Sequence, residues 1–155
     1  MGDVLQVVFG VVALAGSGIV AGVFFAVAVS VLPALLTLPP APYIEMHKKL
    51  GRGYHPAMPL IVNGAMLAEI ALAVLVPAIA PRLLFAAALL LTLGVQGVSH
   101  LANVPINRRL LAIDTSAIPA DWKDPRPEWR SWHSLRTALA MAAVTVNALA
   151  VALLP

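Results

Sequence analysis

The chain of 155 residues contains no cysteine, and only 11% of its residues are charged. The absence of cysteine excludes disulfide bonds and thiolate chemistry, and it leaves the redox compartment undetermined. Soluble domains carry about a quarter charged residues, so the low charge excludes an ordinary soluble protein. Hydrophobic residues make up 61% of the chain, and its mean hydropathy is +0.92. The composition predicts an integral membrane protein.

Four apolar runs are long enough to cross a bilayer as helices, which takes about 20 residues each. The segment "LPPAP" is expected to end the first of them. The polar segment "YIEMHKKLGRGYH" follows and predicts a short amphipathic helix between the first and second spans. We therefore expect an all-α, integral membrane four-helix bundle with up-down topology, formed by residues 1–155 as a single domain. Its predicted helices are 4–38, 57–80, 83–107 and 133–154.

Basic residues predict the orientation of the bundle, because they favour cytoplasmic loops. Only Arg82 lies on the side of the two termini. We therefore expect both termini on the non-cytoplasmic side of a bacterial-type inner membrane. The net charge of +3 follows from this topology, and no sequence feature indicates nucleic-acid binding. The basic residues of the two opposite loops are Lys48, Lys49, Arg52, Arg108, Arg109, Lys123, Arg126 and Arg130.

Polar residues gather toward the end of the third run, in "QGVSHLANVPINRRL". Polar side chains are costly in lipid, so a polar face is expected to point into the bundle or into a wet cavity. At about 100° per residue, four polar side chains share one helix face: Gln96, His100, Asn103 and Asn107.

Other polar residues are expected at similar depths in the membrane as this polar face. At about 1.5 Å per residue, Asn63 lies about 9 Å from the cytoplasmic end of its helix and His100 about 12 Å, while Glu69 and Gln96 lie about 18 Å deep. An intramembrane acid is rare, so Glu69 is expected to be protonated or paired with Gln96 or His100.

The fourth helix adds His133 and Arg136 at its cytoplasmic end. The distribution predicts a polar pocket that opens toward the cytoplasm, with His55 and Trp132 at its mouth. The tryptophans Trp122, Trp129 and Trp132 are also explained as residues of the membrane interface.

Four segments together are similar to the anthrone oxygenase-like family of small four-helix membrane proteins. They are "AGVFFAVAVSVLPAL", "MHKKLGRGYHPAMPLI", "NVPINRRL" and "WRSWHSLRT". The most specific elements are P-x-N-x-x-L at Pro105, Asn107 and Leu110, and W-x-x-x-R at Trp132 and Arg136. Relatives commonly carry Asn at the position of His133, so the resemblance assigns that position no role that requires imidazole.

The resemblance implies oxidation of an anthrone-like polyketide, or another small hydrophobic aromatic or ketone substrate, by dioxygen without a recognised organic cofactor. Such a reaction needs a base, donors for an oxyanion and an apolar hole for the substrate. His100 or His133 is a candidate base, and Asn103, Asn107 and Arg136 are candidate oxyanion donors. Residues expected at the substrate are Asn63, His55, Glu69 and Trp132.

Two other functions remain open from the residues alone. The histidines His47, His55, His100 and His133 are candidate ligands for copper, zinc, iron or haem, although no H-x-x-x-H spacing is present. The second alternative is a non-catalytic membrane module for transport or lipid binding. Small residues at every fourth position of the first helix also suit a homo-oligomer. They are Gly18, Gly22, Ala26 and Ser30.

Overall fold

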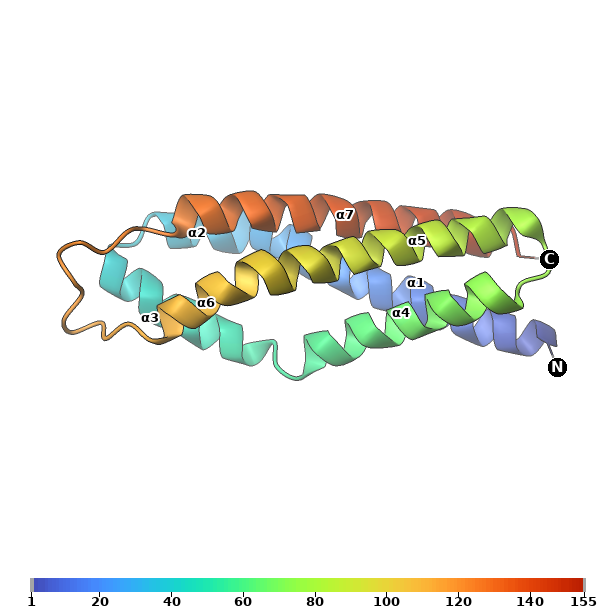
Figure 1. Ribbon diagram of the computed structural model, residues 1–155, viewed down its shortest axis with the longest axis horizontal. Coiled ribbons are helices and arrows are strands. Elements are labelled where there is room, and N and C mark those ends of the chain that lie inside the picture. The colour runs from blue at the N-terminus through green and yellow to red at the C-terminus, as the bar shows by residue number, and fades with distance from the viewer. Residues whose placement is uncertain (1, 155) are drawn as a thin grey trace.

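The structure is a computed structural model that describes residues 2–154. It is an elongated bundle of helices in which both chain ends lie at one end and α2, α3 and α6 lie at the other, here called the loop end (Figure 1). The elements are α1 Gly2–Ala26, η1 Val27–Val31, α2 Leu32–Leu36, α3 Pro40–Gly53, α4 Ala57–Leu75, α5 Ile79–Val98, η2 Ser99–Asn103, α6 Val104–Leu111 and α7 Arg126–Ala152.

Four continuous helical stretches are long and apolar enough to cross a membrane, as predicted. Most of their surface faces outward, as expected of helices in lipid, where apolar side chains need no burial in protein. The protein is therefore an integral membrane helical bundle, and the predicted amphipathic helix between the first and second spans is α3. The four spans are Asp3–Leu36, Ala57–Leu75, Ile79–Leu111 and Arg126–Ala152.

The fourth span begins at Arg126, well before the predicted start at residue 133. The prediction followed the apolar run, whereas this helix starts with a polar turn in which Glu128 and Arg130 are exposed and Trp129 is buried. The third span likewise continues past residue 107 to Leu111. The second span, in contrast, ends at Leu75, before the predicted end at residue 80, because Pro77 follows and disfavours helical backbone at the residue before it.

Proline explains a wide turn in each of the two longest helices. Pro33 and Pro105 have no N–H to donate to the carbonyl four residues earlier. The π-helical turns η1 and η2, at Val27–Val31 and Ser99–Asn103, each end two residues before one of these prolines. Each wide turn adds a residue to one helical turn and changes the face on which later side chains lie.

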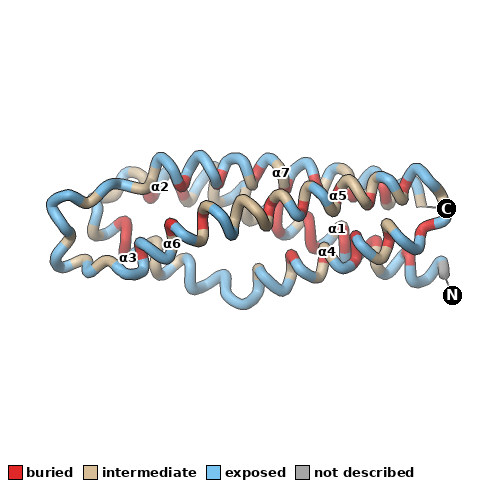
Figure 2. Tube along the Cα trace, in the orientation of Figure 1, coloured by how far each residue is buried: buried red, intermediate tan, exposed pale blue. Residues whose placement is uncertain are grey.

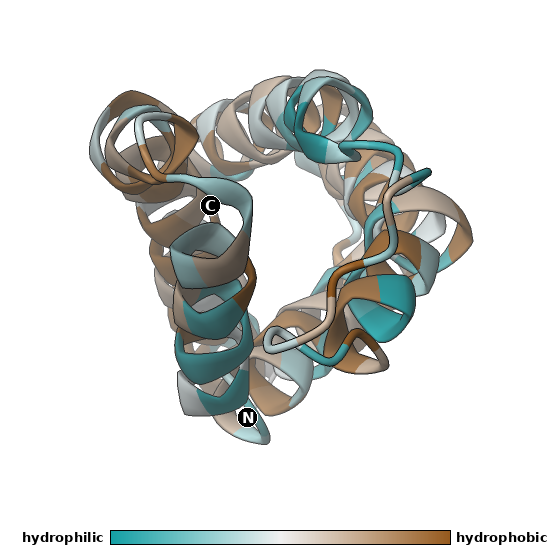
Figure 3. Cartoon of the chain, turned by 90° about the vertical axis from the view of Figure 1, so that its left-hand side faces the viewer, coloured by the Kyte–Doolittle hydropathy of each residue, from teal (hydrophilic) through white to brown (hydrophobic). Residues whose placement is uncertain are grey.

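Seen along its length from the loop end, the bundle is a ring of helices, and hydrophilic colour gathers on the end nearest the viewer (Figure 3). A hydrophobic cluster fills the loop end; its buried members are Leu32, Leu35, Tyr43, Ile44, Ile106, Leu110 and Trp129. Arg126 fixes α7 over this cluster, because its Nη1 donates to the carbonyl of Leu38 at 2.8 Å and its guanidinium lies 5.0 Å from the Tyr43 ring.

The helices approach most closely where side chains are small. A Cβ added to Gly16 would lie 2.9 Å from the Cβ of Ala65, so α1 and α4 touch at this glycine. Among the glycines named from the sequence, Gly18 has only Val144 nearby, at 3.9 Å, and Gly22 has nothing within 4 Å. Gly16 therefore belongs to the packing inside the bundle, and the homo-oligomer stays a prediction.

Candidate functional site

A cavity of about 370 Å³ lies in the loop half of the bundle, bounded by all four spans and by α3. This volume falls in the range of about 300–1,000 Å³ that is typical of small-molecule sites. Most of the wall is apolar, and none of its lining residues, all within the described part of the chain, is acidic. The polar wall residues are His47, Tyr54, Asn63, Gln96, Ser99, His100, Asn107, His133 and Arg136.

Asn107 is held in one orientation by two donors. The indole Nε1 of Trp129 lies 2.8 Å from Asn107 Oδ1, and His47 Nε2 lies 2.9 Å from the same atom. An indole N–H can only donate, so the atom that faces it must be the amide oxygen. His47 must then carry its proton on Nε2, which leaves a lone pair on Nδ1.

Asn107 and His47 each have one side-chain nitrogen without a hydrogen-bond partner in the described part of the chain. The buried side-chain atoms without a hydrogen bond in residues 2–154 are Glu69 Oε2, Asn103 Oδ1 and Asn147 Oδ1. Asn107 Nδ2 and His47 Nδ1 are not among them, and neither has a hydrogen bond within that range. Both atoms are therefore accessible, on residues that line the cavity.

His133 is fully committed to its neighbours. Its Nε2 lies 3.1 Å from the carbonyl oxygen of Phe24 and must donate, because a carbonyl only accepts. Its Nδ1 accepts from Arg136 Nε at 3.0 Å. Neither ring nitrogen is free to take a proton, so His133 positions Arg136 and does not suit the role of base.

Arg136 is a cation without an acidic partner among residues 2–154. Its Nη1 lies 3.4 Å from Ser99 Oγ, and its guanidinium carbon lies 4.4 Å and 5.5 Å from the centres of the Phe24 and Trp129 rings. Ring faces attract a cation but do not neutralise it. The charge is therefore available to an anionic or electron-rich oxygen in the cavity.

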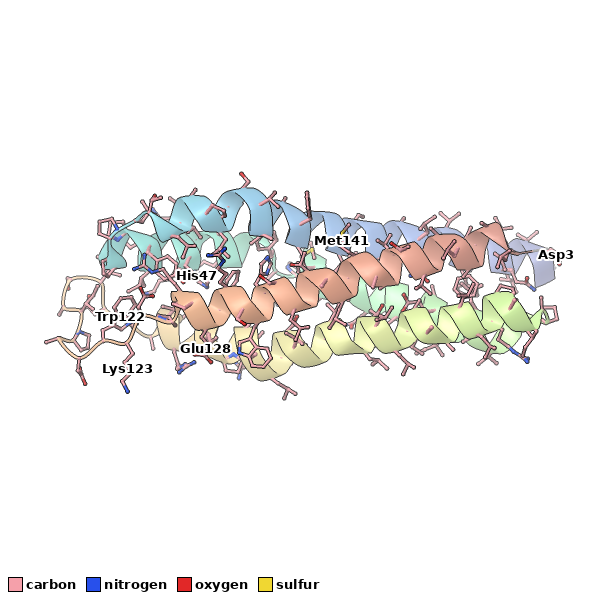
Figure 4. The ribbon with its side chains drawn as sticks, turned by 90° about the horizontal axis from the view of Figure 1, so that it is seen from above. Asp3, His47, Trp122, Lys123, Glu128 and Met141 are labelled. Carbon is pink, nitrogen blue, oxygen red and sulfur yellow. The ribbon has the colours of Figure 1, made fainter. Side chains whose placement is uncertain are left out.

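Four aromatic rings connect α3 and α7 at the site. Trp129 stacks on His133 with centroids 4.8 Å apart and planes at 14°, and its other contact is an edge approach to His47 at 5.6 Å. Tyr43 also contacts His47, with ring centres 5.7 Å apart. These ring contacts fix His47 of α3 relative to Trp129 and His133 of α7. His47 lies in the loop half of the molecule, near the loop that carries Trp122 and Lys123 and far from Asp3 (Figure 4).

Burial lowers the pKa of His47 below its usual 6.5, and the Asn107 hydrogen bond opposes this change while the charge of Arg136 adds to it. Because the pKa is lowered, His47 is neutral at pH 7. A neutral imidazole with a free Nδ1 is able to accept a proton.

The structure brings only some of the predicted site residues to the cavity. Those that line it are Asn63, His100, Asn107, His133 and Arg136. His100 is exposed at the edge of the cavity and has no hydrogen-bond partner within residues 2–154. Asn63 Oδ1 accepts from Gln96 Nε2 at 3.1 Å.

Asn103 does not line the cavity. It is fully buried, and its Nδ2 donates to the carbonyl of Trp129 at 3.2 Å. The prediction assumed an uninterrupted α-helix from Gln96 to Asn107, whereas the π turn η2 intervenes and turns Asn103 toward α7. Its contact joins two helices.

Glu69 also lies outside the cavity wall. It is fully buried, and its Oε1 accepts from Thr92 Oγ1 at 3.1 Å and from Asn147 Nδ2 at 2.7 Å, instead of pairing with Gln96 or His100. Asn147 Nδ2 also lies 3.1 Å from Ser17 Oγ, so each of the four spans supplies one side chain to this polar layer. The depth of Glu69 was predicted from the rise along a single helix, and such a depth contains no information on which helix faces contact each other.

Trp132 and His55 are exposed and do not line the cavity. Trp129, three residues before Trp132, takes the position at the cavity that was expected of Trp132. One signal in the sequence points to it, because the buried residues of α7 recur at helical spacing: Trp129, His133, Thr137, Ala140, Ala143, Asn147 and Ala150.

His47 was predicted only as a metal ligand, since nothing in the sequence placed α3 against the third span. The structure does not gather the four histidines: His55 is exposed and does not line the cavity, and the Trp129 ring stacks on His133 while His47 meets its edge. Within residues 2–154 no three His, Cys, Asp or Glu side chains form a group suited to a metal ion.

The site lies within the part of the chain that matches a known family. The family model described as anthrone oxygenase matches residues 47–146, about two thirds of the chain. No curated protein and no solved structure matches the sequence. The matched stretch begins at His47 and contains Asn107, Trp129, His133 and Arg136. The chain belongs to the anthrone oxygenase family.

Proposed function

We propose that the protein is a membrane-embedded oxygenase that oxidises an anthrone-like or other small hydrophobic ketone with dioxygen. The observation that carries the proposal is Arg136, a guanidinium with no acidic partner within residues 2–154 at an otherwise largely apolar cavity. Such a charge stabilises an enolate far more than it stabilises the neutral ketone, and this difference is what lowers a reaction barrier.

The first step is removal of a proton from the CH₂ carbon that the ketone acidifies; in an anthrone this carbon lies across the central ring from the carbonyl, and conjugation through the ring carries the enolate charge to the carbonyl oxygen. His47 is the proposed base, because its Nδ1 is free and the lowered pKa keeps it neutral. Arg136 and Asn107 Nδ2 are the proposed donors to the enolate oxygen. His100, at the edge of the cavity and without a hydrogen-bond partner in the described chain, is the second candidate base.

The second step consumes dioxygen. The enolate carbon forms a bond to one oxygen atom, and the other oxygen takes the proton, which gives a hydroperoxide. Loss of the second hydrogen of that carbon as a proton breaks the O–O bond, forms the new carbonyl and releases water. The substrate carbon loses two hydrogens and gains one oxygen, so a ketone, dioxygen and this site balance the reaction without a further reductant.

The test is oxygen consumption by the purified protein in detergent with anthrone as substrate. We expect substrate-dependent oxygen uptake, with one quinone formed per dioxygen, and a loss of about 10²-fold or more in Arg136→Gln. Arg130→Gln is the matched control, because Arg130 lies on the same helix, is exposed and does not line the cavity. Equal rates in Arg136→Gln and wild type would refute the role of the guanidinium.

A further inference from the structure

We infer that the cavity opens sideways into the bilayer, between α4 and the α5–η2 segment, and that its ligand is a flat apolar molecule that enters from the lipid. Naming the ligand an oxygenase substrate rests on the proposed function, whereas the entrance itself rests on the geometry of the wall.

The loop end of the cavity is closed. The hydrophobic cluster at that end contains Tyr43, Ile44, Ile106 and Leu110, each no more than 1% exposed. The sequence predicted an opening toward the cytoplasm at this end. The cluster instead separates the cavity from the loops, so a ligand from the cytoplasm would have to displace the best packed residues of this half.

The opposite end is closed as well. Val20, Val62 and Val95 line the deep part of the cavity and are each at most 7% exposed. Beyond them lies the polar layer around Glu69, which is fully buried. The same three valines also line a void of about 10 Å³ beside Ser17 and Thr92, which has room for about one water molecule and none for a ligand.

The exposed residues of the cavity wall lie on two segments, one from Gly51 to Asn63 and the other at His100. Those on the second span and the segment before it are Gly51, Tyr54, Pro59 and Asn63, and the one on the third span is His100. The lining residues on α1 and α7 are buried or half-buried. Figure 2 shows the corresponding exposed stretch at the turn between α3 and α4, where residues 51–57 are all exposed.

Helix packing explains why this side is open. α4 packs on α5 through the Glu69–Thr92 and Asn63–Gln96 hydrogen bonds, but within residues 2–154 it makes no extended contact with η2 or α6. In Figure 1 the junction of α3 and α4 bows away from α5 and α6. The opening therefore begins where the Asn63–Gln96 pair ends the contact of the two spans.

Two large apolar side chains are exposed beside the opening, as expected of a surface that faces lipid. Leu60 on α4 is 68% exposed and Leu101 on η2 is 84% exposed, one on each side of the opening. At about 1.5 Å per residue, Gln96 lies about 18 Å along the helix from Arg108, the expected level of the headgroups. The opening thus extends from the headgroup level into the hydrocarbon.

The Asn63–Gln96 pair forms the deep edge of this entrance. Asn63 is exposed and Gln96 is half-buried, and the two amides bond to each other at 3.1 Å. A single bond between neutral amides holds two helices weakly, so its loss would let α4 move away from α5. The pair is therefore positioned to limit the width of the entrance.

The experiment uses the natural absence of cysteine. A single cysteine in place of Val104, which lines the cavity and is half-buried, reports access from outside. The protein is reconstituted in vesicles, and labelling is timed with N-ethylmaleimide, which dissolves in lipid, and with a sulfonated maleimide, which does not. We expect the sulfonated reagent to react at least about tenfold more slowly, because a fixed charge is costly in hydrocarbon.

Two variants at the end of α3 locate the entrance. Gly51 lines the cavity and Gly53 does not, yet a Cβ at either position meets nothing within 4 Å. We expect Gly51→Phe to slow N-ethylmaleimide labelling of the cysteine severalfold, and the matched control Gly53→Phe to leave the rate unchanged. Pro59→Phe, at an exposed position of the cavity wall, carries the same expectation and serves as the second blocking variant if Gly51→Phe does not fold.

The opposite change is Gln96→Leu, which removes the amide pair and should speed labelling. Equal rates for the two reagents would show an aqueous entrance and overturn the inference, and so would unchanged rates in both Gly51→Phe and Pro59→Phe. Labelling requires no turnover. A protein that labels as expected but does not oxidise anthrone would retain the entrance and lose the proposed function.

Discussion

The indole N–H of Trp129 donates to Asn107 Oδ1 at 2.8 Å, and this one contact orients the amide so that its NH₂ group is left for a ligand. Because the same oxygen also accepts from His47, three elements that are distant in sequence define the direction of a single donor. The Trp129–Asn107 contact leads to the first prediction, which assigns different roles to Asn103 and Asn107 of the third span.

Asn107→Ala is expected to lower kcat/KM for an anthrone-type substrate by about 10²-fold or more, the usual effect of removing an oxyanion donor. Asn103→Ala is the matched contrast, because Asn103 is buried against the Trp129 carbonyl outside the cavity. That variant should lower the melting temperature but keep the activity of the folded fraction. Loss of activity in Asn103→Ala together with normal activity in Asn107→Ala would contradict the assignment of Asn107 to the site.

The second prediction concerns His133, which donates to Phe24 and accepts from Arg136. An asparagine side chain also supplies one donor and one acceptor, so His133→Asn should keep at least part of the activity. His133→Leu should lose it and should destabilise the protein by about 1–3 kcal/mol, because it leaves the Phe24 carbonyl and Arg136 Nε unsatisfied. Rates and melting temperatures of both variants in detergent test this. Equal losses in the two variants would mean that the imidazole itself is required.

The third prediction is a pH dependence of the reaction. The pKa of His47 is lowered from 6.5, chiefly by burial, so the base stays unprotonated to a pH below 6.5. The acid limb of kcat/KM, which reports the free enzyme, should therefore lie below pH 6.5. His47→Gln should abolish that limb together with most of the activity, whereas an unchanged limb in this variant would assign it to another group.

The same residue predicts the pH dependence of stability. The folded state holds the pKa of His47 below its unfolded value, so the unfolded chain binds more protons between the two values. The contribution of His47 is complete above pH 6.5 and is lost as the pH falls from 6.5 toward the lower, folded value. Thermal unfolding from pH 7.5 to pH 5 should show a smaller acid destabilisation in His47→Gln than in wild type.

The fourth prediction concerns the polar layer at Glu69. Glu69→Gln retains an oxygen that accepts from Thr92 and Asn147, so this variant should fold and insert normally. Glu69→Ala leaves the buried Asn147 amide without that acceptor and should cost about 1–3 kcal/mol. Yield of monodisperse protein and melting temperature in detergent measure the difference. Similar behaviour of the two variants would show that these bonds contribute nothing to stability.

The fifth prediction is the orientation of the bundle. The loop end carries Lys48, Lys49, Arg108 and Arg109, so we expect it on the cytoplasmic side of a bacterial inner membrane, with both termini outside. A reporter active only in the cytoplasm should be silent when fused after residue 155 and active when inserted in the loop at residues 114–120. Strong cytoplasmic signal from the C-terminal fusion would invert the orientation.

The sequence by itself determined that the protein is a four-span membrane bundle, because transfer of a helix into lipid depends on the summed hydrophobicity of consecutive residues. It also singled out Asn107, His133 and Arg136, which line the cavity, since polar side chains in apolar helices stand out one by one. Only the tertiary structure decided which of the polar residues meet. A π turn precedes each of the two helix prolines and changes the face on which later side chains lie. In the third span this turn places Asn103 against α7, while Asn107 remains at the cavity. Contacts between segments distant in sequence brought His47 to Asn107 and Glu69 to Asn147. Such pairings depend on how four helices pack in three dimensions, and the spacing of residues along any one of them does not contain that information.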